Sequence, residues 1–284
     1  MKIPFTKAHG ARNDFLLTWR QDAPATGHAD LARAICDRHT GIGADGWMLV
    51  DPPASPEDAA QVHGAIQLYN SDGSMAEISG NGTRCAALFL IRHGYATGYA
   101  TGNATDLVRI RTGAGIKTLR LLTPVATQGV AAQGLAATFE MNMGRPEIGN
   151  LHFDLPLSAG PRDVTILWVG NPQCAMPVEN FDFDWRALGA EIEAHPHFPN
   201  RTNVSFLTPV DEHTIDVRFY ERGAGETMSS GTGSTGAAAT AVARALAKSP
   251  VRVLTPAGPI DLRFEDDIYL TGPAEIVAEG EFLR

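Results

Sequence analysis

The sequence predicts an α+β fold built from two similar halves, each mainly β and each holding one apolar helix. Three observations support this prediction. Short alternating apolar segments run through the chain between glycine-containing turns, which is typical of strands. Two longer segments are rich in alanine and other apolar residues, as buried helices are. Strands and helices do not alternate regularly, which argues against a parallel βαβ fold.

The expected strands have β-branched and aromatic residues at every second position or in short runs. In the first half they cover residues 17–19, 47–50, 65–70, 107–112 and 118–124. In the second half they cover residues 166–171, 204–210, 214–223, 251–258 and 259–266.

Three helices are expected, over residues 30–38, 82–93 and 232–248. The last two are apolar around most of their circumference. A helix of that kind is stable when other elements surround it. We therefore expect each of them to be buried within its half.

A short serine-glycine motif precedes both apolar helices. Ser79-Gly80-Asn81-Gly82 precedes the first, and Ser230-Gly231-Thr232-Gly233 precedes the second. The two serines are 151 residues apart, close to half of the 284-residue chain. This spacing suggests an internal duplication whose halves face each other across a cleft. We place the domains at residues 1–130 and 131–284, with a linker near 131–137 and a final strand that could return to the first domain.

Composition excludes several functional classes. The net charge is −9, which argues against nucleic acid and anionic membranes as partners. No apolar stretch approaches the roughly 20 residues of a membrane span, and the N-terminus has no signal-peptide core, so the cytoplasm is expected. The three cysteines are far apart, which argues against a disulfide framework or a metal site and favours buried reduced thiols. None of the four lysines has an evident pyridoxal phosphate setting.

The glycine-rich turns are candidate anion sites. The first N–H groups of a helix have no internal partners and carry partial positive charge. Two such helix starts directed at one cleft would bind a carboxylate or a phosphate. The competing interpretation is ordinary capping of each helix by its serine.

Several polar residues in loop-like positions suit recognition of an amino acid. Asparagine offers both donors and an acceptor, and a carboxylate beside a guanidinium can bind an ammonium and a carboxylate. The alternatives are turn residues and a surface ion pair. The candidates are Asn13, Asn70, Asn171, Asn203, Glu221 and Arg222.

Seven ordered segments, spread over essentially the whole chain, resemble the diaminopimelate epimerase family. They are MKIPFTKAHGARNDF, HTGIGADGWMLV, YNSDGSMAEISGNGTRCAA, GNPQC, FPNRTNVSF, FYERGAGETMSSGTGSTGAA and LTGPAEIVAEGEF. The resemblance implies two similar domains, each a β-barrel-like sheet around a central helix, with the active site in the cleft between them. It also implies a cytoplasmic, cofactor-free, metal-free homodimer that interconverts LL- and meso-2,6-diaminopimelate for lysine and cell-wall synthesis.

The resemblance also implies residue roles. Asn13, Asn70, Asn171, Asn203 and Arg222 would bind substrate, with Glu221 beside the reacting centre. Gly80, Asn81, Gly231 and Thr232 would hold the reacting carboxylate at the two helix starts. Two residues on opposite faces of the α-carbon would remove and return the proton, at positions 79 and 230.

The chain departs from the family pattern at the centre of the chemistry. Both positions that the family fills with catalytic cysteine are serine here, Ser79 and Ser230. The family's histidine in GNPHC is Gln173, and Arg12 replaces its usual glycine. Three interpretations remain open. They are an epimerase that works with two serines, an enzyme with altered chemistry such as an amino-acid dehydratase or isomerase, and a non-catalytic amino-acid-binding protein.

Overall fold

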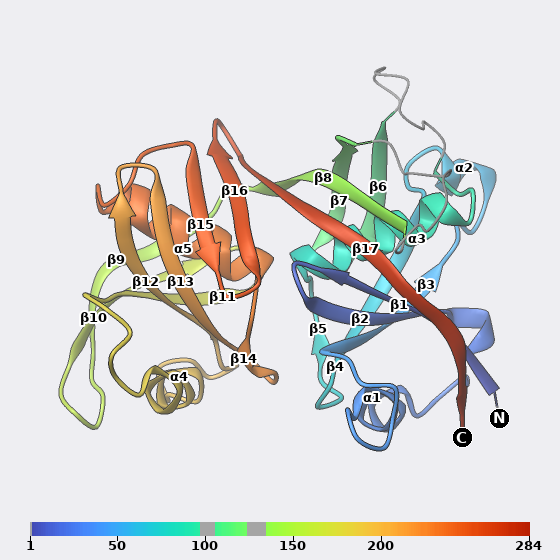
Figure 1. Ribbon diagram of the computed structural model, residues 1–284, viewed down its shortest axis with the longest axis horizontal. Coiled ribbons are helices and arrows are strands. Elements are labelled where there is room, and N and C mark those ends of the chain that lie inside the picture. The colour runs from blue at the N-terminus through green and yellow to red at the C-terminus, as the bar shows by residue number, and fades with distance from the viewer. Residues whose placement is uncertain (1, 97–105, 124–134) are drawn as a thin grey trace. The chain divides into compact units, whose positions relative to one another are not determined.

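The computed structural model describes residues 2–96, 106–123 and 135–284 (Figure 1). The chain divides into two compact units. Unit 1 comprises residues 1–141 together with 272–284, and unit 2 comprises residues 142–271. The predicted boundary at 130/131 lies outside the described residues. Among the residues described, no helix has both the length and the apolar character needed to cross a bilayer.

Eight strands of unit 1 pair in a closed ring, in the order β1, β2, β3, β4, β6, β7, β8, β17 and back to β1. Their bounds are β1 (Lys2–Gly10), β2 (Asn13–Trp19), β3 (Gly46–Asp51), β4 (Gly64–Asn70), β6 (Leu107–Thr112), β7 (Gly115–Leu121), β8 (Leu135–Gly144) and β17 (Ile268–Leu283). The two-residue strand β5 (Met75–Ala76) adds to β4. Ring closure gives each of these eight strands a partner on both sides.

Helix α3 (Gly80–Arg92) is the central helix of unit 1, and it is buried from its first residue to Ile91. It packs on β1, β2 and β6. Helix α1 (His28–Cys36) is amphipathic and packs on the outside, where Leu31 and Ile35 join a core around Trp47. Two short helices, η1 (Arg20–Asp22) and α2 (Pro56–Ala59), complete the unit.

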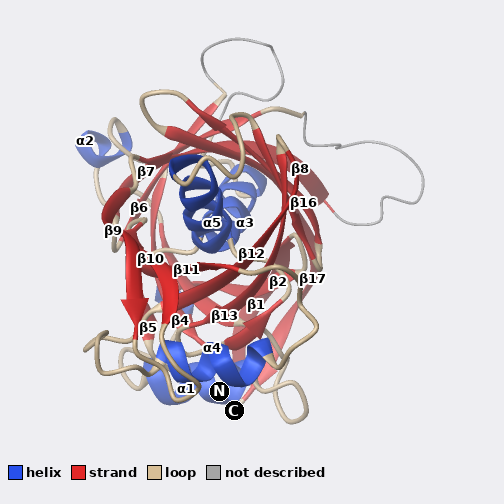
Figure 2. Ribbon diagram, turned by 90° about the vertical axis from the view of Figure 1, so that its left-hand side faces the viewer, coloured by secondary structure: helices blue, strands red, loops and turns tan. Residues whose placement is uncertain are grey.

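Unit 2 repeats this plan. Its elements are β9 (Glu147–Leu155), β10 (Arg162–Trp168), β11 (Pro172–Pro177), α4 (Trp185–Glu193), β12 (Asn203–Asp211), β13 (Thr214–Glu221), β14 (Gly225–Thr227), α5 (Gly231–Ala243), β15 (Val251–Thr255) and β16 (Gly258–Phe264). Helix α5 is buried from Gly231 to Ala241, with strands around it (Figure 2).

The two units share the order of strand pairings. A hairpin leads through an outer helix to a parallel strand in both, β2 to β3 through α1 and β11 to β12 through α4. A second hairpin leads through the central helix to another parallel strand, β4 to β6 through α3 and β13 to β15 through α5. This repetition confirms the predicted α+β fold of two similar β-barrel-like units with central helices.

The sequence-based prediction missed helix α4 and several strands of the structure. The sequence did not indicate α4, because a nine-residue helix with one apolar face gives a weaker signal than the two central helices. Strands β1, β8, β9 and β11 were also missed. Strand β9 exposes most of its residues, so it lacks an apolar alternation. Residues 135–137 of the predicted linker begin β8 instead.

Candidate functional site

Ser79 is the N-cap of helix α3 in unit 1. Its backbone is extended, and its Oγ accepts a hydrogen bond of 3.1 Å from the N–H of Gly82. Gly80 and Asn81 follow as the first two helical residues, both buried. The N–H groups of the first helical turn lack carbonyl partners within the helix, so this turn is a potential anion site.

Asn13 begins β2 and is linked by hydrogen bonds to the start of α3. Its Oδ1 accepts from Asn81 Nδ2 at 3.2 Å, and its Nδ2 donates to Asp45 Oδ2 at 2.7 Å. Both asparagines are buried, at 6% and 0% exposure. The structure therefore joins two of the predicted site residues within unit 1.

Asp45 belongs to a charged cluster that sequence reasoning did not single out. Burial and the neighbouring Asp14 raise the pKa of Asp45, against the hydrogen bond that Asn13 donates. Burial alone would raise the pKa of Asp14 as well, but hydrogen bonds from Arg38 and Lys7 lower it below its ordinary value. Asp45 lies in the segment HTGIGADGW, and its isolated position there gave no independent signal.

Asn70 ends β4 and lies in a turn. Its Nδ2 donates to Ser74 Oγ at 3.0 Å, and its backbone N–H donates to the carbonyl of the same residue at 2.8 Å. It is half-buried. Within unit 1 the described hydrogen bonds do not join it to Ser79 or Asn81, so its substrate role remains a prediction.

Ser230 is the N-cap of helix α5 in unit 2, with the same geometry as Ser79. Its Oγ accepts from the N–H of Gly233 at 3.1 Å. Its hydroxyl also donates to Glu221 Oε2 at 2.7 Å, and Thr227 Oγ1 donates to Glu221 Oε1 at 2.6 Å. Ser230 is 2% exposed. A carboxylate that accepts the serine proton is the arrangement that general-base activation of a hydroxyl requires.

Asn171 precedes β11 and contacts the start of α5. Its Nδ2 donates to Thr232 Oγ1 at 3.3 Å, and its Oδ1 accepts from Gln173 Nε2 at 2.7 Å. Gln173 is 1% exposed, and its Oε1 has no hydrogen-bond partner among the described residues. Asn171 and Thr232 occupy the positions of Asn13 and Asn81, but here the asparagine outside the helix donates and the helix residue accepts.

Asn203 and Arg222 form a second group in unit 2. Asn203 begins β12, donates from Nδ2 to the carbonyl of Pro172 at 3.0 Å and accepts from the backbone N–H of Arg222 at 3.1 Å. The Arg222 guanidinium donates to the carbonyl of Asn200 at 3.3 Å. Three of the four candidate asparagines begin or end strands rather than lie in loops, since Asn13 and Asn203 start strands and Asn70 ends one.

The cysteines cannot replace the serines as bases. All three are buried and free, as expected from the sequence. Burial raises the pKa of Cys36, Cys85 and Cys174 to about 12. A thiol with so high a pKa is almost wholly protonated at neutral pH.

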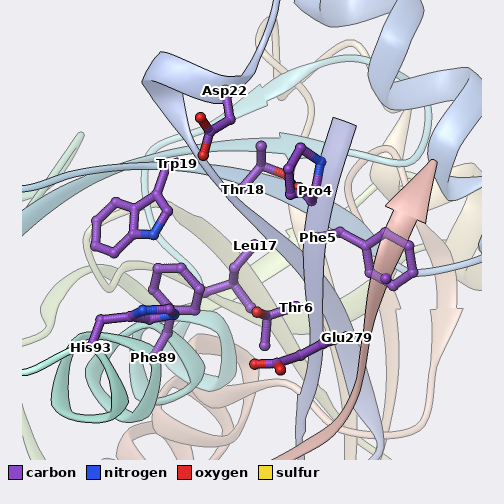
Figure 3. Close-up of a pocket in the computed structure, with 11 residues that line it drawn as sticks. Pro4, Phe5, Thr6, Leu17, Thr18, Trp19, Asp22, Phe89, His93 and Glu279 are labelled. Carbon is purple, nitrogen blue, oxygen red and sulfur yellow. The ribbon is translucent and has the colours of Figure 1, made fainter. Parts of the chain in front are cut away.

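A surface pocket of unit 1 is separate from these residues (Figure 3). Trp19, Phe89 and His93 line one side of it, with Asp22 and Glu279 at its polar margin. None of the predicted site residues lines this pocket.

The sequence profile of the diaminopimelate epimerase family matches residues 5–123 and 165–277. A diaminopimelate epimerase of Halothermothrix orenii is 34% identical over 299 residues, covering 100% of this chain and 99% of the relative. One of Aromatoleum aromaticum is 36% identical over 296 residues, covering 99% of each. The chain belongs to the diaminopimelate epimerase family.

Solved structures agree with this family at the level of the fold. A hydroxyproline epimerase from Agrobacterium vitis superposes with a TM-score of 0.71 at 14% identity, covering 99% of this chain and 92% of that one. A predicted epimerase from Pseudomonas aeruginosa gives 0.68 at 15% identity, covering 99% of both. As a member of the diaminopimelate epimerase family, the chain is an isomerase-type enzyme.

Proposed function

We propose that the chain is a cofactor-independent epimerase that interconverts LL- and meso-2,6-diaminopimelate by two-base proton transfer. Ser79 and Ser230 would act on opposite faces of the α-carbon. The observation that carries the proposal is the pair of matched helix starts, where each serine caps a buried helix and accepts an N–H at 3.1 Å. The family's named members act on diaminopimelate.

The two helix starts would bind the α-carboxylate of the substrate. Backbone N–H groups of Gly80, Asn81, Gly231 and Thr232 belong to the first turns, where the helix dipole favours negative charge. When the α-proton leaves, negative charge builds up on this carboxylate. Fixed donors that face developing charge are among the largest contributions to catalysis.

Serine is a poor substitute for cysteine unless a neighbouring base assists it. A thiol titrates near 8.5, whereas an alcohol has no comparable access to its anion. Each unit of pKa mismatch costs about 1.4 kcal/mol. Glu221 supplies the assistance for Ser230, because its carboxylate already accepts the hydroxyl proton. Proton transfer through the Ser230 hydroxyl to Glu221 would place the effective base at the carboxylate.

The asymmetry between the two serines favours a second candidate function. Within unit 1, the described contact of the Ser79 hydroxyl is the N–H of Gly82, and no carboxylate is bonded to it. Chemistry that needs one strong base, such as elimination or isomerisation of a related amino acid, would use Ser230 and Glu221 alone. In that case Ser79 would serve only as a donor to the reacting group.

Hydrogen exchange at the α-carbon tests the proposal. We expect the protein to exchange the α-proton of LL-diaminopimelate in D₂O and to form the meso isomer. A Ser79→Cys/Ser230→Cys variant should do so faster. Exchange without a meso product would support the one-base alternative. Tight binding with no exchange would make the protein an amino-acid-binding protein and contradict the epimerase proposal.

The family resemblance also implies the setting of this activity. We propose that the enzyme works as a homodimer in the cytoplasm, in lysine and peptidoglycan synthesis, without a metal or an organic cofactor. Sedimentation of the purified protein tests the dimer, with a single species of about 60 kDa expected from a chain of 30.3 kDa.

A further inference from the structure

Arg84 is a completely buried cation in unit 1 with no acidic partner among the residues that the structure describes. It lies in the second turn of α3 and is 0% exposed. Its Nε donates to the carbonyl of Pro273 at 3.1 Å, its Nη2 donates to Asn81 Oδ1, and its Nη1 has no partner among the described residues. Burial lowers the pKa of Arg84 to about 10, so the guanidinium still carries its charge at neutral pH.

The guanidinium of Arg84 is closely packed against the backbone of Gly272. A Cβ atom on Gly272 would lie 2.9 Å from Arg84 Cζ and Nη2, so the glycine backbone packs directly against the guanidinium. A buried charge without a carboxylate is costly. Ionisable groups that burial perturbs in this way are concentrated at functional sites.

The hydrogen bonds of Arg84 start a chain that runs through two candidate site residues. A guanidinium only donates, so Asn81 must turn its Oδ1 toward Arg84 and its Nδ2 toward Asn13. Asn13 must then accept with Oδ1 and donate with Nδ2 to Asp45. Asp45 Oδ2 accepts at the far end, so the chain of hydrogen bonds has one direction from Arg84 to Asp45.

In unit 2, the matching chain of hydrogen bonds has no charged group at either end. The matching chain runs from Gln173 through Asn171 to Thr232, and every member is neutral. Each of these groups can both donate and accept, so this chain could reverse. The position that matches Arg84, five residues after the N-cap serine, is Thr235, whose Oγ1 donates to the carbonyl of Gly231 at 2.8 Å.

We infer that Arg84 is a positioning residue for the proposed substrate site. Its buried guanidinium fixes the amides of Asn81 and Asn13, so that the start of α3 is a preformed carboxylate-binding turn while the start of α5 adapts to the ligand. The inference rests on the proposed function for the identity of the carboxylate. The fixed amides themselves do not depend on it.

The experiment follows the side-chain amides of Asn13 and Asn81 by ¹⁵N NMR, together with the affinity for LL-diaminopimelate. In the unmodified protein we expect both amides to exchange slowly with solvent. Arg84→Met should abolish this protection and weaken binding at least tenfold. Arg84→Lys keeps a buried cationic donor and should retain the protection of the Asn81 amide and an affinity within threefold.

Arg244→Met is the matched control. Arg244 is a nearly buried arginine of unit 2, bonded to Asp163, Thr165 and Leu151, outside both candidate chains. Its replacement should lower thermal stability without changing the two amides or the affinity. Protected amides in a folded Arg84→Met protein would overturn the inference.

A second variant covers the case in which Arg84→Met does not fold. Asn81→Asp can pair with Arg84 but cannot donate to Asn13 Oδ1, whereas Asn13 Nδ2 keeps its bond to Asp45. The side-chain amide resonances of Asn13 should therefore shift strongly although the group stays protected. Unchanged Asn13 resonances in this variant would also overturn the inference. If the unmodified protein does not bind diaminopimelate, the proposed function fails, while the amide measurements still decide whether Arg84 positions the two asparagines.

Discussion

At the scale of single residues, the proposed role of Ser230 as a base depends on its hydrogen bond to Glu221. Its two carboxylate oxygens accept from Ser230 and Thr227 at 2.7 and 2.6 Å. The hydrogen bond from Thr227 holds the carboxylate in the orientation that accepts a hydrogen bond from the Ser230 hydroxyl. A thiol ionises far more readily than an alcohol, so a serine depends more strongly on such a partner.

Replacement of Glu221 by Gln tests this role. The amide cannot accept a proton, although it can keep one hydrogen bond to Ser230. We expect α-proton exchange to fall by about 10²–10⁴-fold, the usual contribution of a general base. Thr227→Val should cost much less, since it removes only the orienting donor. Exchange by Glu221→Gln within threefold of the unmodified rate would remove Glu221 from the mechanism.

Outside the candidate site of unit 1, His63 makes a hydrogen bond that depends on the protonation state of its imidazole. Its Nδ1 accepts from the backbone N–H of Arg109 in β6 at 2.9 Å, which requires an unprotonated nitrogen. Burial and the charge of Arg109 lower the pKa of His63 below 6.5. The folded protein therefore binds this proton less readily than the unfolded chain does.

The consequence for stability has a definite sign. The contribution of His63 is present above pH 6.5 and is lost as the pH falls through its lowered pKa. His63→Asn keeps an acceptor near the same place but does not titrate. Urea unfolding between pH 5 and 7.5 should show a smaller loss of stability at low pH in His63→Asn. Equal slopes for the two proteins would contradict this prediction.

At the scale of elements, the sequence was most informative where one physical requirement dominates. The central helices α3 and α5 were predicted to within a few residues at their starts, because both are apolar and each follows a serine cap. The predicted end of the second, at 248, was too far along, since α5 ends at Ala243 and Ala245 then adopts a left-handed conformation. Nothing in local composition marks that end.

The candidate site was predictable in part for the same reason. Helix starts and their capping serines are local features, so Ser79, Ser230 and their neighbours could be found from spacing. Asp45 could not, because its importance comes from a contact with Asn13, which is distant in sequence. Arg84 lies only three residues after Asn81, but its burial depends on Gly272 and Pro273, which are distant in sequence. An isolated aspartate and an arginine within an apolar helix give no signal until the fold brings their partners to them.

At the scale of the whole molecule, the chain returns to its first unit at the end. Strand β17 pairs with β16 through residues 268–271 and with β1 through residues 275–283. Residues 272–284 therefore belong to unit 1 although they follow unit 2 in sequence. The duplication is visible in the sequence as two serine-glycine motifs. The sequence prediction includes a final strand that could return to the first domain, whereas its pairing with β1 is seen only in the structure.

A circular permutant tests this organisation. Lys2 pairs with Leu283 in the antiparallel ladder, so the two ends of the chain are adjacent within unit 1. Joining them with a short glycine-serine linker and opening the chain between Gly144 and Arg145, in the turn from β8 to β9, makes unit 1 nearly continuous. Because short surface connections cost little, we expect the unfolding free energy of the permutant to be within about 1–2 kcal/mol of that of the parent.

Deleting residues 272–284 should instead expose the amides of β1 to rapid hydrogen exchange, since every pairing from Lys2 to His9 with β17 is lost. If β1 stays protected in the truncated chain, the returning strand is dispensable for the unit 1 barrel.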